Sequence, residues 1–427
     1  MGEGAVLEKT SCCKKTLTES LACVVDRDFE TRQVPFLQEL VRVPSDNPAG
    51  DCAPHALFSA GQLRDLGFEV ECHPVPRDFV ERHGMQSATN LIIRERFGDG
   101  KGPVIALNAH GDVVPPGEGW IHDPYGGVIE NGNLYGRGAA VSKSDFATYA
   151  FALRALKEAA SPLSGTVELH LTYDEEIGGH VGPGWLLAEG LSKPDHVISA
   201  GFTYDVMIAH NGSIQLDVAF TGKAAHSAWP KTGTDAIEAA SRVMSALYAY
   251  RDGLVKTVCS IPGIDTPTLV IGTIEGGVAA NVVPEYAKFR LERRILPDEK
   301  AAKVEAELRQ IIQEAADVLG VQCVVTQHLL ALPLVPDAGQ APLIEALQGA
   351  AEAVLGERIG VKGMPLFTDA RIYSNAGYPT VLYGAGPRRL EDANGHRANE
   401  HVVLEDMRRA TKVIANALAR LLRIETA

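Results

Sequence analysis

The amino-acid sequence predicts an α/β protein with a mostly parallel central sheet and a smaller α+β domain inserted into it. Its 427 residues, 45% of them hydrophobic, are enough to bury two cores. Before about residue 211, apolar strand-like runs alternate with helical ones, which is typical of parallel sheets. From about Gly212 the pattern changes to strands with one polar face, so a different kind of domain begins there.

The elements of the first domain place polar side chains at strand ends. We expect strands over residues 104–107 and 167–173 and a helix over residues 146–156. Ser142 and Asp145 have the spacing of a capping box at the start of this helix. His110 and Glu175 follow the two strands, at the carboxyl ends where parallel sheets carry their functional residues.

The inserted domain begins with a strand over residues 214–220, in which apolar and polar residues alternate. It continues with a helix over 235–250, an apolar strand around 269–271, an extended segment over 286–296 and a helix over 298–319. After about Gln327 the first domain resumes, and it ends in a helix over 405–422. The predicted organisation is a loosely ordered arm over residues 1–27, a first domain in two parts over 28–211 and 328–427, and the inserted domain over 212–327.

Composition argues against several classes of partner. The 40 basic and 54 acidic residues give a net charge of −14, which disfavours nucleic acid and anionic membranes because both need a basic surface. The seven cysteines show no C-x-x-C spacing, so we expect reduced thiols at Cys12, Cys13, Cys23, Cys52, Cys72, Cys259 and Cys323. We find neither a secretion signal nor an apolar run that could span a bilayer, and we expect a cytoplasmic protein.

Two adjacent glutamates, Glu175 and Glu176, are the strongest indication of chemistry in the chain. They follow a predicted strand, with the motif His110-Gly111-Asp112 upstream and His396 far downstream. In a hydrolytic metal site, one carboxylate takes a proton from water while a second carboxylate and imidazoles hold the metal that acidifies that water. This set of residues therefore predicts a metal-dependent hydrolase.

Eight motifs that follow one another along the chain carry a resemblance to a known superfamily. They are His110-Gly111-Asp112, Trp120-x-x-Asp123-Pro124-Tyr125, Leu134-Tyr135-Gly136-Arg137-Gly138-Ala139, Asp174-Glu175-Glu176-Ile177-Gly178-Gly179, Ala225-His226-Ser227, Asn281-Val282-Val283-Pro284, Asp369-Ala370-Arg371 and His396-x-x-x-Glu400. From about residue 30 to its end, the chain resembles the zinc peptidases that include aminoacylases, succinyl-diaminopimelate desuccinylases and carboxypeptidase G.

The resemblance implies a zinc-peptidase-like catalytic domain and an inserted lid domain that dimerises through its sheet. It implies that His110 is a ligand of a first metal, with Asp112 holding its ring. It implies that Glu176 and His396 are ligands of a second metal. Glu175 then matches the general base.

Four further residues acquire roles from the resemblance. His226 resembles a lid histidine that reaches the active site of a neighbouring subunit, so we expect a homodimer or a higher homo-oligomer. Asn281, Arg294 and Arg371 match positions that bind substrate carboxylates or oxyanions. Guanidinium groups suit this task because they meet a carboxylate with two parallel hydrogen bonds.

Structural alternatives to these roles remain open. His226 could be a structural residue of a lid loop, Arg294 could pair with Glu292 or Glu285, and Arg371 could brace Asp369.

Two departures from the superfamily concern the first metal. Val141 stands where the superfamily has an aspartate shared by two metals. Ala200 or Gly201 stands where it has an acidic ligand of the first metal. We therefore expect one divalent transition metal rather than two.

Three protein ligands for this ion can be named. Glu176, His396 and, if the ion shifts toward the vacated position, His110 would supply them. Asp145 is a weaker candidate, because it lies where a helix should begin and is better placed to stabilise the N-terminus of that helix. Nitrogen and carboxylate ligands without thiolate are compatible with Mn, Zn, Co or Fe.

A single metal favours a small carboxylate-bearing substrate with its own electron sink. Hydrolytic deamination of 5-nitroanthranilate to 5-nitrosalicylate and ammonia is such a reaction, and in length and departures the chain is similar to the aminohydrolase of this superfamily that acts on that compound. The substrate carboxylate would lie against Arg294 or Arg371. Two alternatives remain: an N-acyl amino acid deacylase or dipeptidase with substituted metal ligands, and a catalytically inactive small-acid-binding or scaffold protein.

Overall fold

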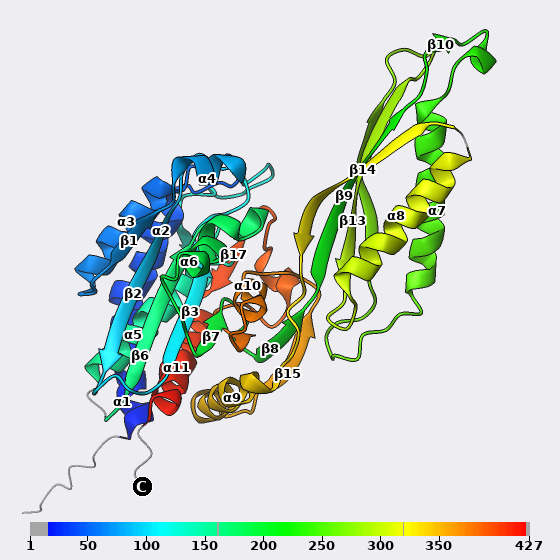
Figure 1. The fold of residues 1–427 in the computed structure, drawn as a ribbon. Helices are drawn as coiled ribbons and strands as arrows, with labels where there is room; N and C mark the ends of the chain where they lie inside the picture. The colour runs from blue at the N-terminus through cyan, green and yellow to red at the C-terminus, as the bar shows by residue number, and fades with distance from the viewer. Residues whose placement is uncertain (1–15, 160–161, 319, 424–427) are drawn as a thin grey trace, which may run out of the picture.

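The computed structural model describes residues 16–159, 162–318 and 320–423 and shows two lobes (Figure 1). The larger lobe, which corresponds to the expected catalytic domain, is built on an eight-stranded sheet in the order β1-β2-β6-β3-β7-β16-β8-β15. Its strands are β1 (Glu71–Pro74), β2 (Thr89–Phe97), β6 (Gly165–Thr172), β3 (Val104–His110), β7 (His196–Ser199), β16 (Thr380–Leu382), β8 (Asp205–His210) and β15 (Gly360–Met364). The central strands β6, β3, β7 and β16 run parallel, so the α/β class and the mostly parallel sheet are confirmed.

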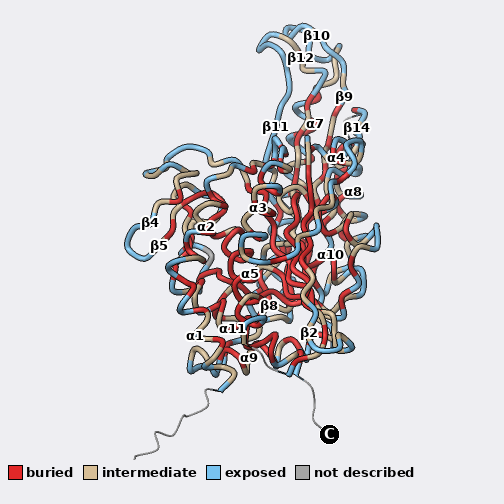
Figure 2. The backbone as a smooth tube through the Cα atoms, turned by 90° about the vertical axis from the view of Figure 1, so that its left-hand side faces the viewer, coloured by how far each residue is buried: buried red, intermediate tan, exposed pale blue. Residues whose placement is uncertain are grey.

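Helices cover both faces of this sheet. They are α1 (Leu17–Asp28), α2 (Val34–Arg42), α3 (Ala53–Asp65), α4 (Arg77–Arg82), α5 (Lys143–Glu158), α6 (Trp185–Ala188), α9 (Ala341–Leu355), α10 (Ala370–Asn375) and α11 (Leu404–Leu421). The main hydrophobic core joins α1, α2, α3, α5, α9 and α11 to one face, because alternate strand residues such as Ile105 and Leu107 point that way. Ala106 points to the other face and packs with Val197 and with Tyr373 of α10. Figure 2 shows this buried centre within an exposed rim.

A small sheet of three strands lies beside the catalytic domain. It pairs β17 (His401–Val403), β5 (Asn133–Tyr135) and β4 (Val128–Glu130), and all three pair antiparallel. Since β17 follows the segment that carries His396, this sheet ties that segment to the loop after β5. Among the described helices, none is both long enough and apolar enough to cross a membrane.

The second lobe is the inserted domain, which we call the lid after the role that the resemblance implies. Its antiparallel sheet has the order β11-β13-β9-β14, made of β11 (Leu269–Gly276), β13 (Tyr286–Ile295), β9 (Gly212–Thr221) and β14 (Gln322–Ala331). Helices α7 (Ala236–Leu254) and α8 (Ala301–Asp317) bury one face, and the opposite face is turned toward the catalytic domain (Figure 1). Two short strands, β10 (Ala225–His226) and β12 (Val282–Val283), form the far tip.

The structure corrects three details of the sequence analysis. Residues 17–28 of the predicted arm form α1, because Leu21 and Val25 are buried in the main core and Thr16 closes a capping box with Glu19; residues 1–15 lie outside the described part. The lid sheet continues to the end of β14 at Ala331, beyond the boundary expected at 327. Cys52, Cys72, Cys259 and Cys323 are free thiols, as expected, while Cys12 and Cys13 lie outside the described residues.

The third correction concerns the start of α5. Ser142 makes no side-chain capping bond there, and its hydroxyl instead accepts from the backbone N–H of His110 at 3.1 Å. The carboxylate of Asp145 accepts from the backbone N–H of Ala385 at 2.6 Å. Tertiary contacts therefore use both side chains that the local pattern assigned to a capping box.

Replacement of Leu21 tests whether α1 is an integral part of the catalytic domain. Leu21→Ala should lower the free energy of unfolding by about 2 to 5 kcal/mol, because it removes a fully buried side chain from a packed core. Leu57→Ala in α3 is the matched control, since Leu57 is 59% exposed, and should change stability by less than about 0.5 kcal/mol. Urea denaturation followed by circular dichroism measures both. Equal, small effects would mean that α1 contributes nothing to the core.

Candidate metal centre

The centre is built where two neighbouring parallel strands end. His110 closes β3 and pairs in register with Thr172, the last residue of β6. The chain then turns sharply at Asp174, whose φ of 111° is stabilised because its carboxylate accepts from the backbone N–H groups of Val181 at 2.6 Å and Gly182 at 2.8 Å. This turn presents the two following glutamates beside His110.

A single 3-10 turn, Glu175–Ile177, carries the glutamates. Gly178 and Gly179 follow with φ values of 133° and 72°, which favour glycine. At Gly179 a side chain would also collide with Ile372 and Asp369 of the neighbouring helix region. The Gly-Gly pair thus allows the tight turn that follows the glutamates.

Four predicted residues come together here. Ligand atoms of His110, Glu175 and Glu176 lie within 4.8 Å of one another. Nε2 of His110 is 3.9 Å from Oε2 of Glu175, and Nε2 of His396 is 3.2 Å from Oε1 of Glu176. The carboxylates of Glu175 and Glu176 are 11% and 5% exposed, so their charges are shielded from bulk water.

Asp112 braces this arrangement in a way that the sequence did not reveal. Nδ1 of His110 lies 2.9 Å from the backbone oxygen of Asp112 and 3.5 Å from its carboxylate. The carboxylate accepts from the side-chain amide of Asn47 at 3.0 Å and from the backbone N–H groups of Glu175 and Glu176, both at 3.3 Å. Asp112 therefore holds both the imidazole and the turn that carries the glutamates.

The segment that carries His396 is tied down by Glu400. The buried carboxylate of Glu400 pairs with Arg137 and accepts from the backbone N–H groups of Ala140 and Val141, both at 3.1 Å. Its backbone oxygen accepts from the N–H of Gly136 at 2.9 Å. The motif around His396 is thus bound to the loop that carries Val141.

Negative charge dominates the electrostatics. Burial and the neighbouring Glu176 raise the pKa of Glu175 well above its usual range, against the effect of His110. Burial opposes protonation of His110, but Asp112 and the two glutamates together raise its pKa well above the usual value. The hydrogen bond to Glu176 raises the pKa of His396. These shifts reflect a surplus of negative charge that a divalent cation would neutralise.

The residues fit a metal ion. Oε1 of Glu176 is buried, and its described polar neighbour is Nε2 of His396 at 3.2 Å, so both atoms are placed to coordinate an ion. Imidazole nitrogens and carboxylate oxygens without thiolate suit Zn, Mn, Co or Fe. Asp145, the weaker ligand candidate, is buried and bonded to Ala385, and burial raises its pKa to about 7.

A cavity of about 240 Å³ opens onto the centre. It is lined by Asn108, Ala109, His110, Ala140, Val141, Ser142, Asp145, Glu175, Glu176, Ser199, Ala200, Gly201, Phe202, Arg294, Met364, Leu366, Phe367, Thr368, Asp369, Gly386, Pro387, Ala393, Gly395 and His396. Eleven of these residues are polar or charged, ten are apolar and three are glycines. Asp369 was noted in the sequence only as a neighbour of Arg371, yet its two oxygens are buried without hydrogen bonds to other described residues, and burial raises its pKa to about 7.

The two predicted substrate-binding arginines differ in position. Arg294 reaches the cavity from β13 of the lid and also pairs with Glu292 at 3.0 Å, as the structural alternative expected. Arg371 is buried, and its Nη2 donates to the backbone oxygen of Gly178 at 2.6 Å rather than to Asp369. Their guanidinium groups lie 5.3 and 5.8 Å from the ring centre of Phe367, which lines the cavity.

His226 and Asn281 are not brought to this centre within one chain. Both are at the tip of the lid around β10 and β12, at the opposite end of the lid from the catalytic domain (Figure 1). They are neighbours there, since the backbone N–H of Ser227 donates to the oxygen of Asn281 at 3.0 Å.

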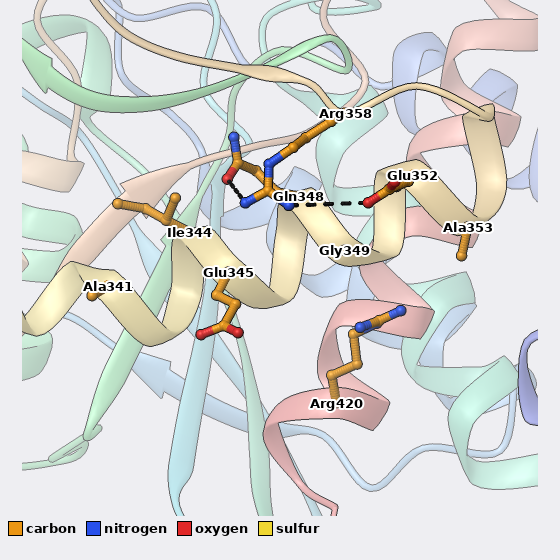
Figure 3. A pocket seen from close by; sticks show the side chains of 9 residues that line it. All are labelled: Ala341, Ile344, Glu345, Gln348, Gly349, Glu352, Ala353, Arg358 and Arg420. Carbon is orange, nitrogen blue, oxygen red and sulfur yellow. Dashed lines mark hydrogen bonds and ion pairs between the residues drawn. The ribbon is translucent and has the colours of Figure 1, made fainter.

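A second hollow lies between α9 and α11, away from the metal centre (Figure 3). Arg358 donates to Gln348 at 2.7 Å and lies 4.0 Å from Glu352, and Arg420 rests over Gly349. Its described lining residues include no histidine or cysteine and balance two arginines against two glutamates. This hollow therefore has no catalytic set of its own.

Comparison with known proteins assigns the fold to a family. A model of peptidase family M20/M25/M40 matches residues 106–420. The chain is 31% identical to succinyl-diaminopimelate desuccinylase of Methylobacterium nodulans over 396 residues, which covers 89% of this chain and 94% of that protein. It is 26% identical to aminoacylase-1 of Mus musculus over 420 residues, which covers 94% and 98%.

Solved structures show the same fold. The dipeptidase Dug1p of Saccharomyces cerevisiae superposes with a TM-score of 0.76 at 15% identity, over 96% of this chain and 99% of that one. The Bacillus subtilis YXEP protein, described as a dinuclear metal-binding peptidase of the M20 family, superposes with a TM-score of 0.68 at 19% identity, over 93% and 99%. The expected class of a metal-dependent hydrolase of C–N bonds is confirmed, because the chain belongs to peptidase family M20/M25/M40.

Proposed function

We propose that the protein hydrolyses the amide bond of an N-acyl amino acid with one divalent metal ion. The observation that carries the proposal is the convergence of His110, Glu175, Glu176 and His396 on one acidic cavity. The similarity to desuccinylases and to an aminoacylase favours this deacylase reaction over the deamination of 5-nitroanthranilate expected from the sequence.

Glu176, His396 and His110 are the proposed metal ligands. A divalent ion held by them supplies Lewis acidity toward the amide carbonyl and lowers the pKa of water. Glu175 contributes no coordination in this scheme and faces His110 across 3.9 Å at the edge of the cavity.

Glu175 is the proposed general base. Its carboxylate takes a proton from the attacking water, whose oxygen bonds to the acyl carbon, and passes it to the amine nitrogen as the C–N bond breaks. Burial raises the pKa of this carboxyl above its usual value, which makes the carboxylate a stronger proton acceptor. Arg294 is placed to bind the carboxylate of the substrate, since it reaches the same cavity from the lid.

One ion per chain is proposed because the first metal position has lost its acidic ligands. Val141 offers no ligand atom, and its side chain lines the cavity. Gly201 has no room for one: a Cβ there would lie 2.8 Å from the backbone nitrogen of Tyr383. An acidic side chain at position 201 would require the backbone after β7 and β16 to move apart.

Elemental analysis after loading with Zn, Mn or Co tests this stoichiometry. We expect about one ion per chain, and a strong loss of binding in Glu176→Gln, since each catalytic ion needs about three protein ligands. Glu189→Gln, at an exposed position after α6, is the matched control and should keep one ion. Two tightly bound ions per chain in the unmodified protein would overturn the proposal.

The reaction is tested by supplying N-acyl amino acids and 5-nitroanthranilate to the metal-loaded protein. We expect release of free amino acid from the former and no ammonia from the latter. Glu175→Gln should lower turnover by about a hundredfold or more while leaving metal content unchanged, because only the proton acceptor is lost.

Glu189→Gln again serves as the control and should retain full activity. Ammonia release from 5-nitroanthranilate, with N-acyl amino acids untouched, would replace the deacylase by the deamination. If the unmodified protein turns over neither N-acyl amino acids nor 5-nitroanthranilate, and Glu175→Gln behaves in the same way, the catalytically inactive binding protein is favoured.

We further propose that two chains pair through the lid. The edge strand β11 has no partner on its outer side among the described strands, and Val270, Ile274 and the nearby Val278 are exposed there. His226 and Asn281 then have a use that they lack within one chain, because a paired lid would carry them to the other subunit's cavity.

Mixing two inactive variants tests this pairing. His226→Ala and Glu175→Gln should each be inactive alone, whereas random mixing after dissociation should restore about a quarter of the activity, because half the dimers are mixed and one of their two sites is complete. The readout is amino acid release. No recovery, with mixed dimers shown by mass spectrometry, would mean that His226 does not serve the partner's site.

A further inference from the structure

The cavity beside His110 contains an apolar corner that we call the Val141 recess. It is formed by Ala140, Val141, Ala200, Gly201 and Phe202, which all line the same cavity as the metal centre. By the resemblance described above, positions 141 and 200 or 201 would carry acidic ligands in a two-metal relative. In this chain the side chains at those positions are apolar, and the buried carboxylate of Asp145, which accepts from the backbone N–H of Gly201, lies beside them.

The walls of the recess are fixed in place. The backbone N–H groups of Ala140 and Val141 donate to Glu400 at 3.1 Å, and Arg137 pairs with the same carboxylate. On the opposite side, the N–H of Ala200 donates to the oxygen of Asn108 at 2.9 Å. A side chain such as Val141 is therefore presented by a rigid backbone rather than by a mobile loop.

Behind Gly201, a second glycine, Gly386, allows two backbone segments to approach each other closely. The N–H of Gly386 donates to the oxygen of Gly201 at 2.8 Å, and a Cβ at Gly386 would lie 2.6 Å from that oxygen and 3.1 Å from the ring of Phe202. Backbone thus packs on backbone behind the recess, so this wall cannot move back without breaking that contact.

Charge determines what kind of group fits. Arg294 is the one lysine or arginine among the described residues that line the cavity, and it already faces Glu292. The acidic residues of the lining are Asp145, Glu175, Glu176 and Asp369. A substrate carboxylate can meet Arg294, but a second carboxylate placed in the recess would face acidic neighbours and apolar walls, which disfavours it.

We propose that the Val141 recess binds the acyl group of the substrate and selects neutral, apolar acyl groups over charged ones such as succinyl. This inference rests on the proposed amide hydrolysis, with Arg294 engaging the single carboxylate of the amino acid. Removal of apolar atoms from water into preformed apolar walls supplies the preference. Val141 and Ala200 are its specificity-determining residues.

Four N-acyl derivatives of one amino acid, carrying acetyl, butanoyl, benzoyl and succinyl groups, test the proposal. Butanoyl and succinyl share a four-carbon chain and differ in charge. We expect kcat/KM for butanoyl to exceed that for succinyl and for acetyl by about tenfold or more, since two added methylenes are buried without a charge. Comparable values for butanoyl and succinyl would overturn the proposal.

Variants that fill the recess with a larger side chain provide a second test of the proposal. Val141→Phe should lower kcat/KM for butanoyl and benzoyl at least tenfold more than for acetyl. Ala200→Leu fills the recess from its other wall and gives the same test if Val141→Phe does not fold. Val258→Phe, at a position 70% exposed on the surface, is the matched control and should leave all four values unchanged. Equal losses for all four acyl groups in both filled variants would reject the recess as the acyl site.

Measuring the affinity of the N-acyl derivatives shows whether this inference has failed or only the proposed reaction has failed. If no N-acyl amino acid is hydrolysed, the proposed reaction fails, and titration calorimetry of the metal-loaded Glu175→Gln variant decides the inference. Tighter binding of the butanoyl than of the succinyl derivative, lost in the double variant with Val141→Phe, would keep the recess as a site for neutral groups. Equal or reversed affinities would reject it.

Discussion

Mutual repulsion among buried carboxylates is the constraint on which the centre depends. Asp112, Glu175, Glu176 and Asp369 gather where β3, β6 and the start of α10 meet, and each is largely withdrawn from water. Asp112 is stabilised by Asn47 and by two backbone N–H groups. The glutamates face imidazoles instead, and ionised carboxylates buried with so little compensation are costly unless a cation joins them. The geometry of the fold therefore favours a bound metal ion.

The metal centre could be predicted from the sequence because two of its residues lie at the carboxyl ends of strands. His110 and Glu175 follow runs whose apolar character alone indicates buried strands, and adjacent parallel strands bring such ends together. His396 and Glu400 follow from the order of motifs, not from local pattern, because the bonds of Glu400 reach Arg137 and Val141 more than 250 residues earlier. Contacts of that separation are invisible to periodicity, although the motifs that make them are present in the sequence.

Local rules failed where tertiary contacts competed for the same side chain. Ser142 and Asp145 satisfy the spacing of a capping box, but their oxygens bond to His110 and Ala385 instead. Likewise, the imidazole of His110 is nearer to the backbone oxygen of Asp112 than to its carboxylate. At α1 the sequence analysis expected a loosely ordered arm where the structure has a helix. Short amphipathic helices gain most of their stability from packing against the rest of the protein, and the buried Leu21 shows that α1 is packed in this way.

The lid contributes to the cavity through the register of a single strand. On β13, Arg293 and Arg294 point to opposite faces: Arg293 is buried against Glu299 at 2.7 Å, and Arg294 reaches the cavity. The pairing of Arg294 with Ser213 of β9 fixes this choice, since a slip by one residue would exchange the two guanidinium groups. The buried pair with Glu299 also makes such a slip costly, because it would leave a charge uncompensated in the lid core. The hydrophobic alternation that folds the lid is thus the same feature that supplies an arginine to a cavity whose described lining contains four acidic residues.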